Sequence, residues 1–258
     1  MTTRRIAAVS CALAAAAGVA GNAAGAAAAP LSALYADASQ PDISGLWVVT
    51  GAFYFAPDRA LPKLKGEYKT LYARRTEAFK AGIAVDDVTA DCLPAGLPHL
   101  FVVPYPFELM QTPGRVTFLH EYDSVVRRVP LTGAASLKVD EDRVTYDGDS
   151  AGHWEGDTLV IDTVNVRADT QLDFTGTPHS DQLHITERLR RKDATTLENR
   201  ITLTDPKAYE EPFTVTREYR LRPKWKISEY VCEENNRNAT DAAGHTTGGM
   251  PPPKKEAP

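Results

Sequence analysis

One strand in the C-terminal half of the chain carries residue types that can transfer protons. Side chains alternate between the two faces of a strand, so His184, Thr186 and Arg188 are expected on one face and Glu187 on the other, among aliphatic neighbours. Burying a carboxylate among Ile and Leu side chains is costly unless the carboxylate is paired. A buried carboxyl group also tends to have the raised pKa that a general acid or base needs. Glu187 and His184 are therefore candidate catalytic residues, with Arg188 in a substrate-binding role.

The same position has a purely structural interpretation. Glu187 could form a salt bridge with an arginine of a neighbouring strand, such as Arg217 or Arg200. The alternation alone does not separate the two interpretations.

A second candidate lies on the expected strand over residues 116–122. His120 should share one face with Phe118 and Tyr122, while Glu121 points the other way. An imidazole between aromatic rings can line an apolar pocket and titrate near neutral pH. We therefore predict that His120 is catalytic and that Tyr122 binds substrate; the alternative is a histidine that only fills the core.

Loops between the later strands carry more polar residues. His153 and Asp149 precede a Gly-Asp turn, Asp162 lies on the next strand, and His179 lies in a Thr-Pro-His-Ser loop. Loops of this kind can meet at one mouth of a barrel, where ligands usually bind. We predict substrate-binding roles for His153, Asp162 and His179; hydrogen-bonded turn residues are the alternative. A metal site is not expected, because no familiar ligand spacing is present.

The absence of other motifs narrows the possible chemistry. The sequence has no Gly-x-Gly-x-x-Gly or Walker motif, so no nucleotide cofactor is expected, and we predict that the protein uses no cofactor. The sequence favours a cofactor-independent lyase, isomerase or cyclase that uses His and Glu on a small apolar or aromatic substrate. The alternatives are a lipocalin-like binding or carrier protein for a small apolar ligand and, third, a structural envelope protein.

The elements that must position these residues are mostly strands. Leu64, Tyr68, Leu71, Tyr72, Arg75 and Phe79 have helical spacing, with Gly82 as a stop signal. Alternating β-branched and aromatic residues predict strands over 101–110, 116–122, 158–164, 182–191, 197–203, 213–221 and 227–231. Turn signals separate these strands, so we predict an all-β fold, an antiparallel lipocalin- or calycin-like barrel or a closely packed sandwich, with one N-terminal helix.

The two ends of the chain differ from the region between them. Residues 1–29 have the cationic start, Ala-rich apolar run and small-residue end of a signal peptide, so we expect a periplasmic or secreted protein. Arg4 and Arg5 leave twin-arginine export open as an alternative to the general secretory route. We expect a linker over 30–41, one domain over 42–238 and a disordered tail over 239–258.

The charge balance limits the partners. The full chain has 29 basic and 34 acidic residues, and loss of Arg4 and Arg5 leaves a net charge of −7. This balance argues against nucleic acid and against an anionic membrane surface. Beyond the signal, no stretch approaches the ~18 apolar residues that a membrane span needs. A small-molecule ligand or substrate is the expected partner, and the sequence does not indicate an oligomeric state.

The expected mature chain retains two cysteines, Cys92 and Cys232. An oxidising compartment favours a disulfide between them, whereas two free buried thiols or a metal pair are the alternatives.

A longer pattern resembles a large family of exported bacterial β-rich proteins. The pattern runs Gly148-Asp149-Ser150-Ala151-Gly152-His153-Trp154-Glu155-Gly156-Asp157-Thr158-Leu159-Val160-Ile161-Asp162-Thr163, then His179-Ser180, Leu183-His184-Ile185-Thr186-Glu187-Arg188, Asp205-Pro206 and Tyr230-Val231-Cys232-Glu233-Glu234-Asn235. In addition, Gly45-Leu46-Trp47 resembles the lipocalin entry motif, in which a Trp closes the base of a barrel. These resemblances imply export, a β-rich fold and the cysteine pair, and they imply no reaction.

Overall fold

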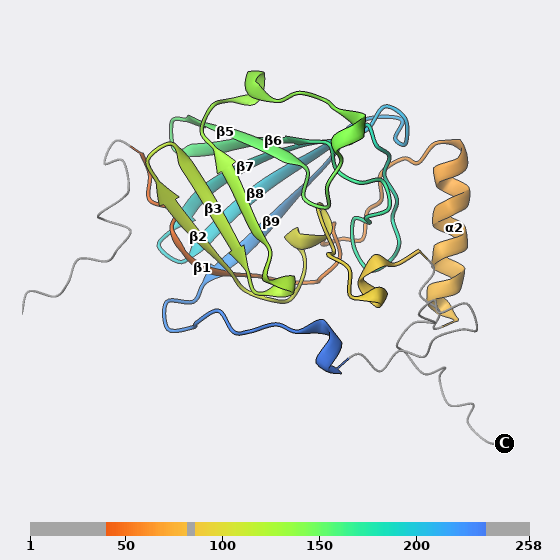
Figure 1. The fold of residues 1–258 in the computed structure, drawn as a ribbon, viewed down its shortest axis with the longest axis horizontal. Helices are drawn as coiled ribbons and strands as arrows, with labels where there is room; N and C mark the ends of the chain where they lie inside the picture. Colours follow the sequence, from red (N-terminus) through yellow and green to blue (C-terminus); the bar gives the residue numbers. More distant parts are fainter. Residues whose placement is uncertain (1–39, 82–85, 236–258) are drawn as a thin grey trace, which may run out of the picture.

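The protein is built on one antiparallel sheet that curves into a nearly closed barrel (Figure 1). The computed structural model describes residues 40–81 and 86–235. The strands are β1 (Gly45–Val49), β2 (Phe107–Thr112), β3 (Arg115–His120), β4 (Val126–Pro130), β5 (Asp149–Glu155), β6 (Thr158–Val164), β7 (His184–Asp193), β8 (Thr196–Thr204) and β9 (Phe213–Leu221). Their order across the sheet is β4-β3-β2-β1-β9-β8-β7-β6-β5.

The predicted all-β antiparallel barrel is confirmed. The predicted signal peptide and tail, and the predicted linker up to residue 39, lie outside the described residues.

The predicted helix is α2 (Gly66–Lys80), which lies beside one end of the barrel (Figure 1). Its buried residue Arg75 packs against the connection between β6 and β7 and donates a hydrogen bond of 3.4 Å to the Gly176 carbonyl. No helix within the described residues has the length and apolar character that a bilayer span requires. Short 3-10 helices lie in the connections: η1 (Val88–Asp91), η2 (His99–Phe101), η3 (Tyr122–Ser124), η4 (Ala134–Ser136), η5 (Glu141–Arg143) and η6 (Cys232–Asn235).

Two predicted strands differ from the structure. The strand predicted over 101–110 begins only at Phe107, because Pro104 and Pro106 lack the N–H groups that a ladder needs. The segment predicted as a strand over 227–231 has no ladder partner. It follows β9, but both sides of β9 are already paired, with β1 and with β8. This last segment instead leads to η6.

A disulfide ties this C-terminal segment to the middle of the chain. Cys92 and Cys232 are bonded, with their Cα atoms 5.6 Å apart. Cys92 follows η1 at the start of the Leu-Pro-Ala-Gly-Leu-Pro loop. The predicted cysteine pair is therefore confirmed, and the alternatives of free thiols and a metal pair are excluded.

Besides β1, which carries the Gly45-Leu46-Trp47 motif, the predicted strand ranges omit β4 and β5, and these two strands are the edges of the sheet. β4 contains two arginines in five residues, and β5 starts with Gly148-Asp149-Ser150, which has the composition of a loop. Gly148 has φ +65°, and an added Cβ would lie 2.4 Å from the Val164 carbonyl oxygen. Only glycine fits this entry to β5.

The barrel closes where β4 and β5 approach each other without a backbone ladder. Here Val129 and Leu131 reach close to Gly152, where a Cβ would lie 3.2–3.3 Å from their side chains. The Gly133 N–H donates one hydrogen bond of 2.9 Å to the Gly152 carbonyl across this gap. We call this line between β4 and β5 the seam of the barrel.

The interior is divided into two hydrophobic clusters. One contains Leu97, Leu100, Val102, Ile185, Ile201, Leu203, Tyr209 and Val215, and the other contains Trp47, Phe107, Leu109, Val116, Phe118, Leu159, Leu189, Leu197 and Tyr219. The inward-facing positions that separate them on β7, β8 and β9 are Glu187, Asn199 and Arg217, all about 1% exposed. A layer of buried polar groups thus crosses the barrel between two apolar halves.

Candidate functional site

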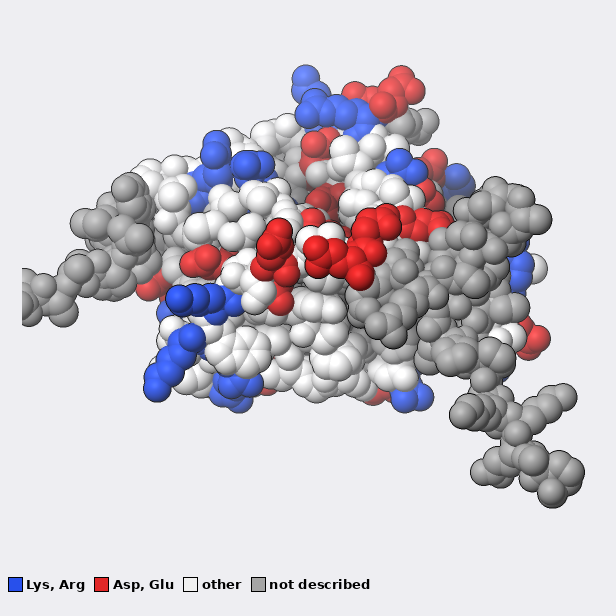
Figure 2. Space-filling view, turned by 60° about the horizontal axis from the view of Figure 1, so that its bottom comes forward, with Lys and Arg blue, Asp and Glu red and all other residues white. Residues whose placement is uncertain are grey.

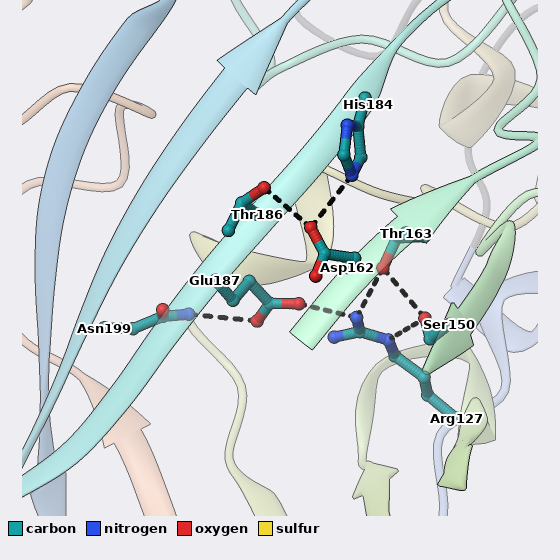
Figure 3. A network of polar contacts seen from close by, with 8 residues as sticks. All are labelled: Arg127, Ser150, Asp162, Thr163, His184, Thr186, Glu187 and Asn199. Carbon is teal, nitrogen blue, oxygen red and sulfur yellow. Dashed lines mark hydrogen bonds and ion pairs between the residues drawn. The ribbon is translucent and has the colours of Figure 1, made fainter. Parts of the chain in front are cut away.

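The polar layer is organised around Arg127, which points inward from the edge strand β4 (Figure 3). Its Nη2 donates to Glu187 Oε1 at 2.5 Å and to Thr163 Oγ1 at 2.9 Å, and its Nε donates to Ser150 Oγ at 3.1 Å. The two hydroxyl groups lie 2.9 Å apart. Because Ser150 is on β5, this arginine side chain bridges the seam of the barrel.

Glu187 lies in the core, as the strand alternation predicts. Its Oε1 accepts from Arg127 and its Oε2 accepts at 3.0 Å from the Asn199 side-chain amide. The predicted salt bridge therefore exists, but the predicted partners, Arg217 and Arg200, are wrong. Arg217 donates to the backbone carbonyls of residues 50, 52 and 54, and Arg200 faces the outer side of β8.

His120 also points into the barrel, with its side chain buried next to two phenylalanine rings. The Phe107 and Phe118 ring centroids lie 5.3 Å and 6.3 Å from the imidazole centroid. Burial, with a smaller contribution from the Arg127 charge, lowers the pKa of His120 to about 3. The imidazole is therefore neutral at physiological pH, contrary to the expectation that it titrates near neutrality.

Tyr122 does not share a strand face with His120. β3 ends at His120, and Asp123 and Ser124 both have positive φ angles, which turn the chain away. The Tyr122 ring packs instead on Tyr105 and Tyr230, with centroids 5.3 Å and 4.8 Å away.

His120 and Glu187 line the same cavity inside the barrel. Its volume is about 10 Å³ for the centre of a water-sized sphere, which is room for roughly one water molecule. The lining residues are Leu100, Phe101, Phe107, Phe118, His120, Arg127, Glu187, Leu189, Asn199 and Tyr219.

Three polar residues of this cavity were missed from the sequence: Arg127, Asn199 and Tyr219. The Asn199 Oδ1 atom is buried and has no hydrogen-bond partner within the described residues. The Tyr219 hydroxyl donates at 3.2 Å to the Phe101 carbonyl, and burial raises its pKa. The same alternation that placed Glu187 could have found Asn199, which lies inward between the apolar Leu197 and Ile201.

His184 lies on the outer face of the barrel, so it cannot act together with Glu187. Its Nε2 lies 2.9 Å from Asp162 Oδ1, which also accepts from Thr186 Oγ1 at 2.9 Å (Figure 3). Asp162 is thus satisfied by two neighbours on β7.

Arg188 and His153 occupy the same outer face. Both contact Glu155, with Arg188 Nη2 2.8 Å from Oε2 and His153 Nε2 3.1 Å from Oε1. All three side chains are at least 40% exposed. The Arg188–Glu155 contact links β7 to β5 across β6, and such an exposed ion pair contributes little stability.

His179 is fully buried in the connection between β6 and β7. Its Nε2 lies 2.7 Å from Thr170 Oγ1 and its Nδ1 lies 2.9 Å from the Ser180 carbonyl, and burial lowers its pKa. Next to it, Asp205 accepts from the Ser180 N–H and hydroxyl at 2.6 and 2.7 Å. The loop residues that were predicted to meet at one mouth of the barrel are therefore not brought together. His179 and Asp205 instead hold the turn around Ser180 in place.

The surface carries both acidic and basic side chains, as expected for a chain with a small excess of acidic residues. In Figure 2 acidic side chains run across the middle of the face shown, while basic ones are scattered around its edge.

Within residues 40–81 and 86–235, no group of three or more His, Cys, Asp or Glu side chains is placed to hold a metal ion. Comparison with protein-family models, curated proteins and solved structures finds no match to this chain.

Proposed function

We propose that the barrel interior is the active site of an exported, cofactor-independent isomerase, lyase or cyclase that moves a proton on a small apolar or aromatic carbonyl compound. The observation that carries this proposal is the convergence of His120 and Glu187 on one cavity, with Arg127 beside both. Buried ionisable groups that converge on a cavity are typical of acid–base sites.

The geometry suggests a distinct task for each group. The Glu187 carboxylate takes the proton from the carbon next to the substrate carbonyl, and the C–H electron pair moves onto the carbonyl oxygen to form an enolate. His120 is neutral, so it stabilises that oxygen by donating a hydrogen bond rather than by a positive charge. Arg127 supplies the positive charge that balances the negative charge of the enolate. When the enolate electron pair returns to carbon, proton transfer from Glu187 to a different carbon gives an isomer. Alternatively, the returning pair forms a carbon–carbon double bond and the adjacent carbon releases a leaving group with its bonding electrons, which gives the product of a lyase.

The small cavity requires that a substrate moves part of the wall. Leu100 and Phe101 line the cavity from η2, which is a short 3-10 helix outside the sheet. Displacing these two side chains opens the interior without breaking a ladder hydrogen bond. We therefore propose that substrate enters past η2.

The alternative of a carrier for a small apolar ligand is supported less well by this cavity. A carrier interior is expected to be largely apolar, whereas five of the ten lining residues here are His, Arg, Glu, Asn and Tyr. A lining with this many polar groups favours a ligand that can form hydrogen bonds over a wholly apolar one.

Exchange of substrate protons with solvent tests the proposal before the natural substrate is identified. Small ketones, aldehydes and enones are incubated with the mature protein in D₂O, and deuterium uptake next to the carbonyl is followed by NMR. We expect catalysed uptake for at least one compound class, with strong loss in His120→Gln and Glu187→Gln.

The matched control is His184→Gln, on the same strand as Glu187 but on its outer face. Circular dichroism checks that each variant is folded under the assay conditions. Equal exchange in His120→Gln and the wild type would contradict the proposal, as would the absence of catalysed exchange across all three classes.

A further inference from the structure

We propose that a second pocket, between α2 and residues 54–61, binds a small aromatic or aliphatic carboxylate. The pocket has a volume of about 240 Å³. Since an apolar cavity of about 150 Å³ can hold benzene, this one has room for a single substituted ring. It shares no lining residue with the barrel cavity, so this proposal stands or falls independently of the proposed function.

The walls of the pocket are mainly apolar. Tyr54 and Leu61 line one side and Tyr72 and Phe79 of α2 line the other. The Phe174 ring supports both sides, with centroids 5.1 Å from Tyr54 and 5.9 Å from Phe79. Aromatic walls of this kind favour a flat apolar ligand.

A polar atom in the wall has no partner. The Thr76 hydroxyl oxygen is buried and makes no hydrogen bond within the described residues, although Thr76 lines the pocket. A threonine in a helix usually bonds back to the carbonyl four residues earlier. A buried hydroxyl without a partner costs free energy. Because this oxygen is closed off from solvent, a ligand oxygen satisfies it only when the surrounding wall side chains move apart.

The charges of the pocket favour an anion. Arg59 and Lys80 line it, and neither forms an ion pair with another described residue. Asp173 is the acidic lining residue, but its Oδ2 accepts from the Phe55 N–H at 2.7 Å and its Oδ1 accepts from the N–H and hydroxyl of Thr175. This carboxylate is already satisfied, so the two cations remain for the ligand.

Arg59 is placed to bind a carboxylate. Its guanidinium lies over the Tyr54 ring, with Cζ 4.2 Å from the ring centroid. Stacking occupies the face of the guanidinium and leaves its N–H groups free at the edge, where they can bind a carboxylate in a bidentate manner. A ring between the aromatic walls with its carboxylate at Arg59 would use each of these features.

Titration of the mature protein with benzoate, followed by amide chemical shifts, tests the site. We expect saturable shifts centred on residues 54–61 and 72–80, and at least tenfold weaker binding of benzamide, which has the same shape without the charge. The double variant Arg59→Gln/Lys80→Gln should bind benzoate at least tenfold more weakly, and Thr76→Val should weaken it about threefold.

Two further variants make the test specific. Lys69→Gln removes a charge from α2 outside the pocket and should leave benzoate binding unchanged. Ala60→Phe fills the pocket and should abolish the shifts. Equal affinity for benzoate and benzamide, shifts located elsewhere, or no saturable shifts at millimolar benzoate would each overturn the proposal.

Discussion

Arg127 Nη2 lies 2.5 Å from Glu187 Oε1 in the interior of the barrel, and this ion pair joins the edge strand β4 to β7, the third strand from the opposite edge. The same arginine donates to Ser150 on β5, the opposite edge of the sheet. Side chains therefore close the barrel where no backbone ladder does. The proposed active-site groups and the closure of the barrel depend on the same contacts.

Glu187→Gln is expected to destabilise the fold strongly. The amide keeps the shape of the side chain but removes the carboxylate that is hydrogen-bonded to the buried Arg127, and breaking such a buried pair typically costs about 3–5 kcal/mol. Urea unfolding of the variant and the wild type measures the difference in free energy of unfolding. A loss below about 1 kcal/mol would show that this ion pair contributes little to stability.

The double replacement Arg127→Met/Glu187→Leu is the matched control. Replacing both charges with apolar side chains of similar size is often neutral or stabilising. We therefore expect the double variant to recover most of the stability lost in Glu187→Gln. Failure to recover would mean that Ser150, Thr163 and Asn199 need a charged partner.

Local patterns predicted the inward position of Glu187 because alternation depends only on the strand that carries it. Its partner Arg127 depends on closure of the barrel, which brings together residues on β4 and β7 that no local pattern relates. β5 was missed because Gly148 and Gly152 suit a loop, whereas the structure needs them for close approach at the seam. Tyr122 was misplaced because two consecutive positive φ angles follow it, and nothing in the strand pattern indicates them.

His120 should make stability depend on pH in the acid range. Its pKa is about 3 in the folded protein, against about 6.5 in an unfolded chain. The unfolded state therefore binds a proton first, so the contribution of His120 is complete above pH ~6.5 and is lost as the pH falls toward ~3. Burial also lowers the pKa of His99 and His179, so they act in the same direction.

The variant His120→Phe removes this one titration while keeping a ring between Phe107 and Phe118. Between about pH 6.5 and 4.5, its stability should fall by about 2–3 kcal/mol less than that of the wild type. Urea unfolding at several pH values gives this difference. An NMR signal of the His120 ring that titrates near pH ~6.5 in the folded protein would contradict the expectation.

Removing the disulfide should lower stability because the bond closes a loop with a sequence separation of 140. The chain-entropy model predicts that a disulfide closing a loop of this size stabilises the folded protein by about 4–5 kcal/mol. The double variant Cys92→Ala/Cys232→Ala is compared with the wild type by urea unfolding. Thiol titration of the denatured, unreduced mature protein, which lacks Cys11, should find no free thiol, and two free thiols would contradict the bond.

Trp47→Ala is expected to cost about 3–5 kcal/mol, the usual range for removing a fully buried Trp from a core. Trp47 is 0% exposed in the apolar cluster at one end of the barrel, and its indole N–H donates at 3.1 Å to the Ile43 carbonyl. The Arg191 guanidinium lies over the ring, with Cζ 5.4 Å from the centroid. The substitution therefore leaves a cavity, an unpaired carbonyl and a cation without its aromatic partner.

Trp225 provides the matched control for Trp47. It is 53% exposed on the segment after β9, so Trp225→Ala should change the free energy of unfolding by less than about 0.5 kcal/mol. Both variants are measured by urea unfolding followed by far-ultraviolet circular dichroism, since each substitution removes a fluorescent tryptophan. If the two variants lost the same stability, Trp47 would not anchor the base of the barrel.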